Sequence, residues 1–84
     1  MNYFRIIAWG ECPFCIKAKA LLLQEGYEIE YVILDHAPEL LSFYKSIYDM
    51  TTVPIVVYCG DTKEDEKVIG GYTDLVKYFE RETR

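Results

Sequence analysis

Two cysteines, Cys12 and Cys15, stand three residues apart in the segment ECPFC at positions 11–15. Cysteines at this spacing occur as redox-active dithiols, as half of a zinc site and as a structural pair. Redox chemistry requires a thiolate, because the thiolate and not the thiol is the nucleophile. The elements around the pair therefore decide what it can do.

The cysteine pair lies between a predicted strand and a predicted helix. Residues 3–9, YFRIIAW, are rich in aromatic and β-branched residues, which is typical of a strand. Apolar residues recur at helical spacing over residues 14–23. Pro13 suits the first turn of that helix, and Gly26 suits its end.

The start of this helix favours a thiolate on Cys12, because unpaired N–H groups and the helix dipole stabilise a negative charge there. Glu11 opposes the thiolate through like charge, but an exposed carboxylate is well screened. Cys15 lies one turn further along the same face and is less exposed, so it suits the role of resolving thiol. Pro13 stiffens the spacing between the sulfurs, and Phe14 offers a ligand an apolar surface.

The remaining periodicity predicts strands at residues 28–34, 55–59 and 67–69 and helices at residues 38–48 and 73–82. Asp35 is the predicted N-cap of the helix at 38–48. The apolar stripe of that helix consists of Leu40, Leu41, Tyr44, Ile47 and Tyr48. Strands joined through a helix pair in parallel, and residues 55–69 form a hairpin. The order β-α-β-α-β-β-α predicts an α/β, thioredoxin-like fold, a four-stranded mixed sheet flanked by three helices, in which a lone C-x-x-C indicates redox chemistry.

Composition narrows the class of protein. A chain of 84 residues with 51% hydrophobic residues supports a single domain, residues 1–84, with a packed core. The net charge of −5 gives no attraction for nucleic acid. No apolar run reaches the roughly 20 residues of a membrane helix, and nothing resembles a signal peptide. We therefore expect a cytoplasmic monomer without nucleic-acid or membrane partners.

A zinc site is the main alternative for the cysteines. Cys12, Cys15, Cys59 and His36 together make a Cys₃His set. However, the set has a single C-x-x-C, and Cys59 and His36 belong to separate predicted elements. We therefore expect no metal site, and interpret Cys59 as a small buried hydrophobe and His36 as a loop residue.

Three motifs together resemble a dithiol glutaredoxin over nearly the whole chain. They are CPFC followed by IKAK at 12–19, TVP at 52–54 and GGYTDL at 70–75, in the family's order and spacing. The family typically carries CPYC, so Phe14 replaces a tyrosine. The resemblance implies a cis peptide bond before Pro54 and assigns Pro13, Phe14 and Pro54 to active-site support.

The resemblance also implies glutathione as a co-substrate, with no bound cofactor. The implied glutathione site consists of Cys12, Phe14, Thr52, Val53, Pro54, Gly71, Tyr72, Thr73 and Asp74. The Thr73 hydroxyl and the start of the last helix would hold the γ-glutamyl carboxylate, and Asp74 the amino group. The pair Gly70-Gly71 permits positive φ and close backbone approach. Many members carry Lys or Arg where this chain has Trp9, so Lys17 and Lys45 are candidate substitutes.

The expected activity is glutathione-dependent reduction of protein disulfides and glutathione mixed disulfides through Cys12 and Cys15, with ribonucleotide reductase as a protein substrate implied by resemblance alone. Two alternatives remain open. One is a glutaredoxin-like redoxin reduced by thioredoxin reductase, which Trp9 favours and GGYTD opposes. The other is a module that binds an iron–sulfur cluster through Cys12 and glutathione in a dimer.

Overall fold

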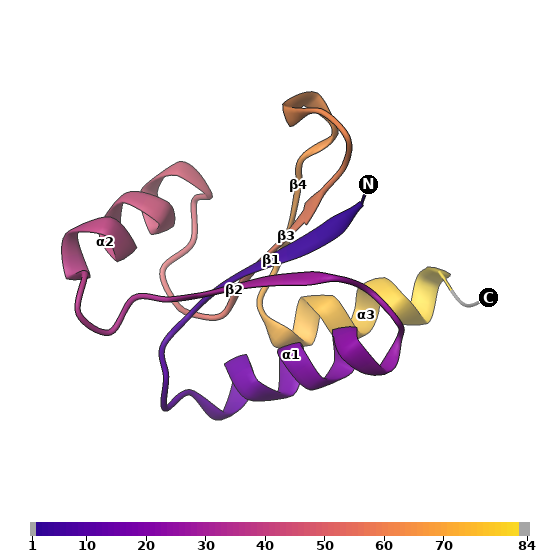
Figure 1. The fold of residues 1–84 in the computed structure, drawn as a ribbon, viewed down its shortest axis with the longest axis horizontal. Coiled ribbons are helices and arrows are strands. Elements are labelled where there is room, and N and C mark those ends of the chain that lie inside the picture. The colour runs from indigo at the N-terminus through magenta and orange to yellow at the C-terminus, as the bar shows by residue number, and fades with distance from the viewer. Residues whose placement is uncertain (1, 83–84) are drawn as a thin grey trace.

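Strands and helices follow one another in the predicted order. The computed structural model describes residues 2–82 (Figure 1). The elements are β1 (Tyr3–Ala8), α1 (Pro13–Gln24), β2 (Ile29–Ile33), α2 (Pro38–Ile47), β3 (Ile55–Cys59), the short 3₁₀ helix η1 (Lys63–Asp65), β4 (Lys67–Gly70) and α3 (Tyr72–Glu82). Across the described residues, no helix has the length and apolar character needed to cross a bilayer.

The four strands form one mixed sheet in the order β2-β1-β3-β4. Strands β1 and β2 are parallel, whereas β1 with β3 and β3 with β4 are antiparallel. Ile7 near the end of β1 therefore lies opposite Ile55 at the start of β3, and Val56 lies opposite Gly70 at the end of β4. The segments that follow β1, precede β3 and follow β4 consequently meet at one end of the sheet. This end carries all three sequence motifs.

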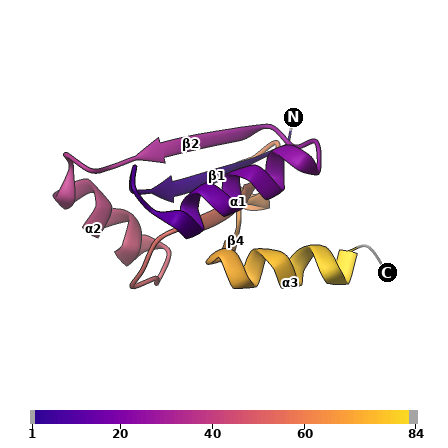
Figure 2. The ribbon, with the colours of Figure 1, turned by 90° about the horizontal axis from the view of Figure 1, so that it is seen from below.

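Helices cover both faces of the sheet, as predicted (Figure 2). Side chains alternate along β1, so that Phe4 and Ile6 pack on the side of α1 and α3 while Ile7 packs on the side of α2. The core between the sheet, α1 and α3 contains Phe4, Ile6, Ala8, Cys12, Cys15, Ala18, Leu22, Val56, Leu75 and Phe79. We call this set the dithiol core because both cysteines of the pair belong to it.

Helix α1 begins and ends at the predicted signals. Pro13 is its first residue, and Gly26 has a φ of 84° beyond its end. The N–H groups of Gly26 and Tyr27 donate to carbonyls of the last turn at 3.1 Å, which closes the helix in a Schellman-type cap. The apolar periodicity over 14–23 was less informative about burial: Ile16 and Leu23 are more than half exposed, and only Cys15, Ala18 and Leu22 of this helix are buried.

The prediction for the start of α2 was wrong. Its N-cap is Ala37, which makes no side-chain capping bond, whereas Asp35 accepts a hydrogen bond at 2.9 Å from the backbone N–H of Gly10. The Asp35 carboxylate binds the loop after β1 instead of capping α2, because Gly10 follows β1 and Asp35 follows the neighbouring strand β2. The predicted stripe of α2 is also only partly buried: Leu41 is buried, but Leu40 and Ile47 are 43% and 51% exposed.

Candidate active site

Cys12 is the N-cap residue of α1, as the sequence predicted. Its backbone is extended, and its Sγ accepts a hydrogen bond at 3.2 Å from the backbone N–H of Cys15. The first N–H groups of a helix have no partner within the helix, so the sulfur satisfies one of them. Only 8% of Cys12 is exposed. A negative charge on this sulfur would be stabilised by the N–H group and the helix dipole.

Cys15 is completely buried, one turn into α1. Burial raises the pKa of Cys15 to about 12, and the hydrogen bond and charge of the neighbouring Cys12 add to the effect. Cys15 therefore stays a neutral thiol at physiological pH. All three cysteines of the chain are free thiols in this structure. Both sulfurs therefore belong to the core, but Cys12 lies at the end of the helix with 8% of the residue exposed, whereas Cys15 is completely enclosed.

Eight of the nine residues expected to bind glutathione line a single hollow of about 210 Å³. They are Phe14, Thr52, Val53, Pro54, Gly71, Tyr72, Thr73 and Asp74; we call this surface the Phe14 hollow. The ninth residue, Cys12, lies two positions before Phe14. The rings of Phe14 and Tyr72 lie 6.0 Å apart and form an apolar wall. The Val53–Pro54 peptide bond is cis, and Val53 precedes β3, so it stands outside the sheet ladder.

Asp74 shapes the start of α3. Its Oδ2 accepts a hydrogen bond at 3.1 Å from the backbone N–H of Gly71, which lies just before the helix. Gly70 makes room for this carboxylate: its φ is 121°, and a Cβ at this position would lie 2.5 Å from Asp74 Oδ2. Of the pair Gly70-Gly71, only Gly70 has the predicted positive φ. Asp74 is 3 residues into a helix whose dipole favours its negative charge.

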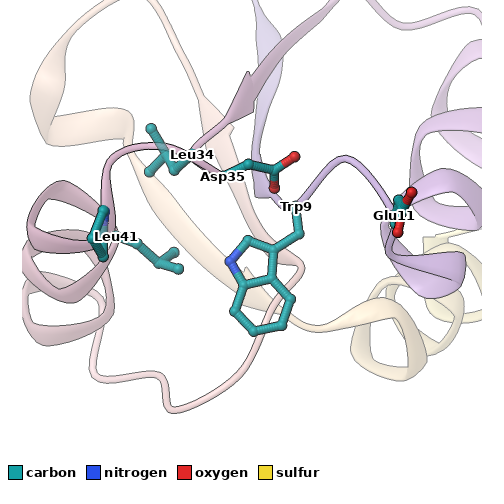
Figure 3. A pocket seen from close by; sticks show the side chains of 6 residues that line it. Trp9, Glu11, Leu34, Asp35 and Leu41 are labelled. Atoms are coloured by element: carbon teal, nitrogen blue, oxygen red, sulfur yellow. The ribbon is translucent and has the colours of Figure 1, made fainter.

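A second, larger hollow of about 540 Å³ lies beside the loop that leads to Cys12. It is lined by Trp9, Glu11, Leu34, Asp35, Pro38 and Leu41; we call it the Trp9 hollow. Figure 3 shows the indole of Trp9 projecting between Leu41 and Glu11, with Asp35 above it. Two of the lining residues are carboxylates and none is basic. The lining residues themselves therefore offer no cation to the carboxylates of an anionic ligand.

The two candidate lysines contact different aromatic rings. Lys17 Nζ lies 5.4 Å from the ring centre of Phe14, and Lys45 Nζ lies 5.6 Å from that of Trp9. Lys17 thus borders the Phe14 hollow, whereas Lys45 borders the Trp9 hollow. Each of the two lysines thus lies over an aromatic ring near one of the hollows beside the segment that carries the cysteine pair.

Cys59 and His36 do not join the cysteine pair. Cys59 pairs with Tyr3 at the start of β1, whereas Cys12 follows the end of that strand. His36 is exposed in the loop before α2. Within the part of the chain that the structure describes, no three His, Cys, Asp or Glu side chains are grouped so that they could hold a metal ion.

Two residues near the pair were not found from the sequence. Asp35 ties the loop before Cys12 to the end of β2 through Gly10. Tyr31 places its hydroxyl in the interior beneath α1 without a hydrogen-bond partner. Strand alternation predicts that Tyr31 faces inward, but a missing partner cannot be read from a sequence.

Comparison with known proteins agrees with this geometry. The glutaredoxin family model matches residues 5–62, which include the cysteine pair and TVP. A hybrid peroxiredoxin, hyPrx5, of Haemophilus influenzae is 44% identical over 68 residues, which are 81% of this chain and 25% of that protein. The chain therefore spans about a quarter of that relative's length.

A glutaredoxin of Pseudomonas aeruginosa is 37% identical over 68 residues, which cover 81% of this chain and 71% of the relative. Among solved structures, a buckwheat glutaredoxin–glutathione complex superposes with a TM-score of 0.79 at 22% identity, over 95% of this chain and 70% of that one. The fold, the cysteine pair at the start of α1 and the extent of these matches lead to one assignment: the chain belongs to the glutaredoxin family and has its thioredoxin-like fold.

Proposed function

We propose that this chain is a glutathione-dependent oxidoreductase that reduces protein disulfides and glutathione mixed disulfides. The observation that carries the proposal is the asymmetry of the pair. Cys12 Sγ caps α1 and accepts the 3.2 Å hydrogen bond from the Cys15 N–H, while the Cys15 thiol is completely buried behind it. A thiolate at the helix end is suited to attack, and a buried thiol one turn away is suited to resolve.

The proposed reaction starts when the Cys12 thiolate attacks a substrate disulfide. The disulfide bond breaks, one substrate sulfur leaves as a thiolate and takes a proton, and Cys12 forms a mixed disulfide with the other sulfur. Cys15 then attacks Cys12, which releases the second substrate thiol and leaves a Cys12–Cys15 disulfide. Two glutathione molecules reduce this disulfide and become glutathione disulfide. For a glutathione mixed disulfide, Cys12 alone suffices, because a second glutathione can remove the glutathionyl group.

Glutathione fits the Phe14 hollow by the chemistry of its lining. Thr73 and the first N–H groups of α3 suit the γ-glutamyl carboxylate, and Asp74 suits the amino group. The solved structure of the buckwheat relative is described as a glutathione complex. Trp9 and the two carboxylates of the Trp9 hollow give no matching support for the glycine carboxylate, so Lys17 and Lys45 are the candidates for that contact.

The protein substrate is a separate part of the proposal. Ribonucleotide reductase is suggested only by family resemblance. A peroxiredoxin is a second candidate, because the relative that is 44% identical is named a hybrid peroxiredoxin. We propose the cytosol as the compartment, since its glutathione pool matches the redox range of glutaredoxins.

A donor assay tests the proposal. The reduced protein is supplied with a glutathione mixed disulfide, and NADPH consumption is followed with glutathione and glutathione reductase in one reaction and with thioredoxin reductase alone in another. We expect turnover only in the first. Turnover only with thioredoxin reductase would instead identify a redoxin of the competing type. A visible-absorbing cluster after anaerobic purification, with turnover in neither reaction, would favour the iron–sulfur module.

A further inference from the structure

The hydroxyl of Tyr31 is buried without a partner. Among the described side chains, it is the one buried oxygen or nitrogen atom that makes no hydrogen bond. A hydroxyl that leaves water without gaining a new hydrogen bond makes the folded state less stable. Phenylalanine would fill the same space without this penalty. An uncompensated polar group of this kind is a candidate for a role that the resting structure does not show.

The Tyr31 side chain packs against the core that contains the cysteine pair. In the sheet, Tyr31 is opposite Ile6, and it packs against the dithiol core, which contains Ile6, Cys12 and Cys15. Lys19 Nζ lies 4.9 Å from the centre of the Tyr31 ring. Residues i and i+4 share one helix face, so Lys19 lies one turn beyond Cys15 on that face. The ring therefore lies between β2 and α1, the helix that carries the resolving cysteine.

The surroundings keep the Tyr31 hydroxyl protonated. Burial raises the pKa of Tyr31 above its ordinary value, and Cys15, Cys12 and Asp35 raise it further whenever they are ionised. Among the residues that the structure describes, the charged or titratable groups found to act on the phenol are these three and Lys19, which lies over its ring. Tyr31 can consequently donate a hydrogen bond throughout the pH range in which the protein would work.

We propose that the Tyr31 hydroxyl donates a hydrogen bond to the Cys15 sulfur while that sulfur attacks the Cys12 mixed disulfide. Both thiols are free in this structure, and Cys15 gains negative charge only when it resolves the mixed disulfide. A buried sulfur developing charge needs a donor, because no water reaches it. The Tyr31 hydroxyl has no other hydrogen-bond partner, so it is available to become that donor.

The step is balanced without any further reagent. Cys15 loses its proton and forms a bond to Cys12 Sγ, the bond between Cys12 and the substrate sulfur breaks, and the substrate sulfur leaves with the electron pair and takes up the proton. Tyr31 keeps its own proton throughout. The inference rests on the dithiol route of the proposed function, and it adds a residue that acts on the second half of that route alone.

Reaction with 5,5′-dithiobis(2-nitrobenzoate) separates the attack by Cys12 from the resolution by Cys15. Attack by Cys12 releases the first nitrothiobenzoate at a rate that depends on reagent concentration, and attack by Cys15 releases the second at a rate that does not. The variants are made in a Cys59→Ala background, so that only the pair reacts. We expect Tyr31→Phe to slow the second phase roughly tenfold, the effect of one hydrogen bond to a charged group, and to leave the first phase unchanged.

Tyr58→Phe is the matched control, because Tyr58 also packs against the dithiol core but has no orphan hydroxyl. We expect both phases to be unchanged in this variant. We also expect Tyr31→Phe to unfold at the same or a higher urea concentration than the parent, so slower resolution would not reflect a damaged fold.

Three results would overturn the inference: an unchanged second phase in Tyr31→Phe, equal slowing in Tyr58→Phe, or equal slowing of both phases in a destabilised Tyr31→Phe. Absence of a second phase in the parent protein would instead refute the dithiol route itself.

Discussion

The backbone N–H of Cys15 donates to the sulfur of Cys12 across 3.2 Å. The second cysteine thus supports the first through its main chain, while its own thiol is buried and has a pKa of about 12. Because the donor is a backbone group, a substitution of the Cys15 side chain leaves it in place. The two cysteines can therefore be tested separately.

We expect Cys12→Ser to abolish turnover with every disulfide substrate, because the attacking sulfur is lost. Cys15→Ser should retain turnover with a glutathione mixed disulfide and lose the reduction of a protein disulfide, which needs the resolving thiol. The glutathione reductase assay measures both activities. Equal losses with the mixed disulfide in the two variants would rule out a route through Cys12 alone.

Asp74 has two separable tasks, the hydrogen bond to the Gly71 N–H and the proposed contact with the amino group of glutathione. Asp74→Asn keeps an oxygen acceptor and removes the charge, so we expect an apparent KM for glutathione about fivefold higher with nearly unchanged stability. Asp74→Ala should raise KM similarly and also lower the free energy of unfolding by about 1 kcal/mol. Steady-state kinetics of the two Asp74 variants give the KM for glutathione, and urea denaturation gives their free energies of unfolding. Unchanged KM in both variants would contradict the glutathione contact.

Trp9→Lys restores a basic group beside the cysteine pair, and we expect it to lower the KM for a glutathione mixed disulfide by about twofold to fivefold, the effect of an exposed ion pair. Lys17→Gln and Lys45→Gln, compared in the parent chain, test which lysine contacts the glycine carboxylate. The one that raises KM is the substitute. A higher KM in Trp9→Lys would show that the indole itself contributes to binding.

The backbone conformation at position 70 and the closeness of the Asp74 carboxylate both require a glycine there. Gly70→Ala should lower the free energy of unfolding by about 3 kcal/mol or more, because its φ is 121° and the new Cβ would lie 2.5 Å from Asp74 Oδ2. Gly26→Ala is the control: its φ is 84°, but nothing lies within 4 Å, so only the backbone cost of about 1 kcal/mol applies. Urea denaturation compares the two. Equal losses would mean that the close approach of Asp74 is unimportant for stability.

The buried Cys15 thiol makes stability depend on alkaline pH. Its pKa is raised from about 9.0 to about 12 on folding, so the folded state holds the proton more tightly than the unfolded chain. The contribution of Cys15 to stability is therefore complete below about pH 9 and is lost as pH rises toward about 12. Cys15→Ala should show a shallower decline over this range in anaerobic urea denaturation. Parallel curves for the two proteins would contradict the raised pKa.

Much of the fold could be predicted because its signals are local. Pro13 marks the start of α1 because proline fixes φ near a helical value and has no N–H to donate. Gly26 marks the end because glycine readily adopts the positive φ that closes a helix. The continuous apolar run at residues 55–59 and the charged turn after it predict a buried hairpin strand without knowledge of its neighbours. The position of Cys12 at a helix start follows from the same signals, whereas the hydrogen bond that its sulfur accepts from Cys15 was found only in the structure.

Burial of the helix faces was less predictable. Ile16 and Leu23 fit the apolar pattern of α1 and yet are 55% and 54% exposed. Several phases of a helix are compatible with an apolar run of this length, and the choice among them depends on where the sheet and α3 lie. Asp35 illustrates the same limit, since its partner Gly10 is 25 residues away in the chain.

The sequence by itself determined the order of elements, the location of the cysteine pair at a helix start and the family. These depend on residue types within a few positions of one another. Only the tertiary structure decided that the Phe14 hollow and the acidic Trp9 hollow flank the pair, that Asp35 holds the loop before Cys12, and that the Tyr31 hydroxyl lies buried without a partner. Each of these depends on side chains brought together from different strands and helices, where packing and not local propensity selects the contact.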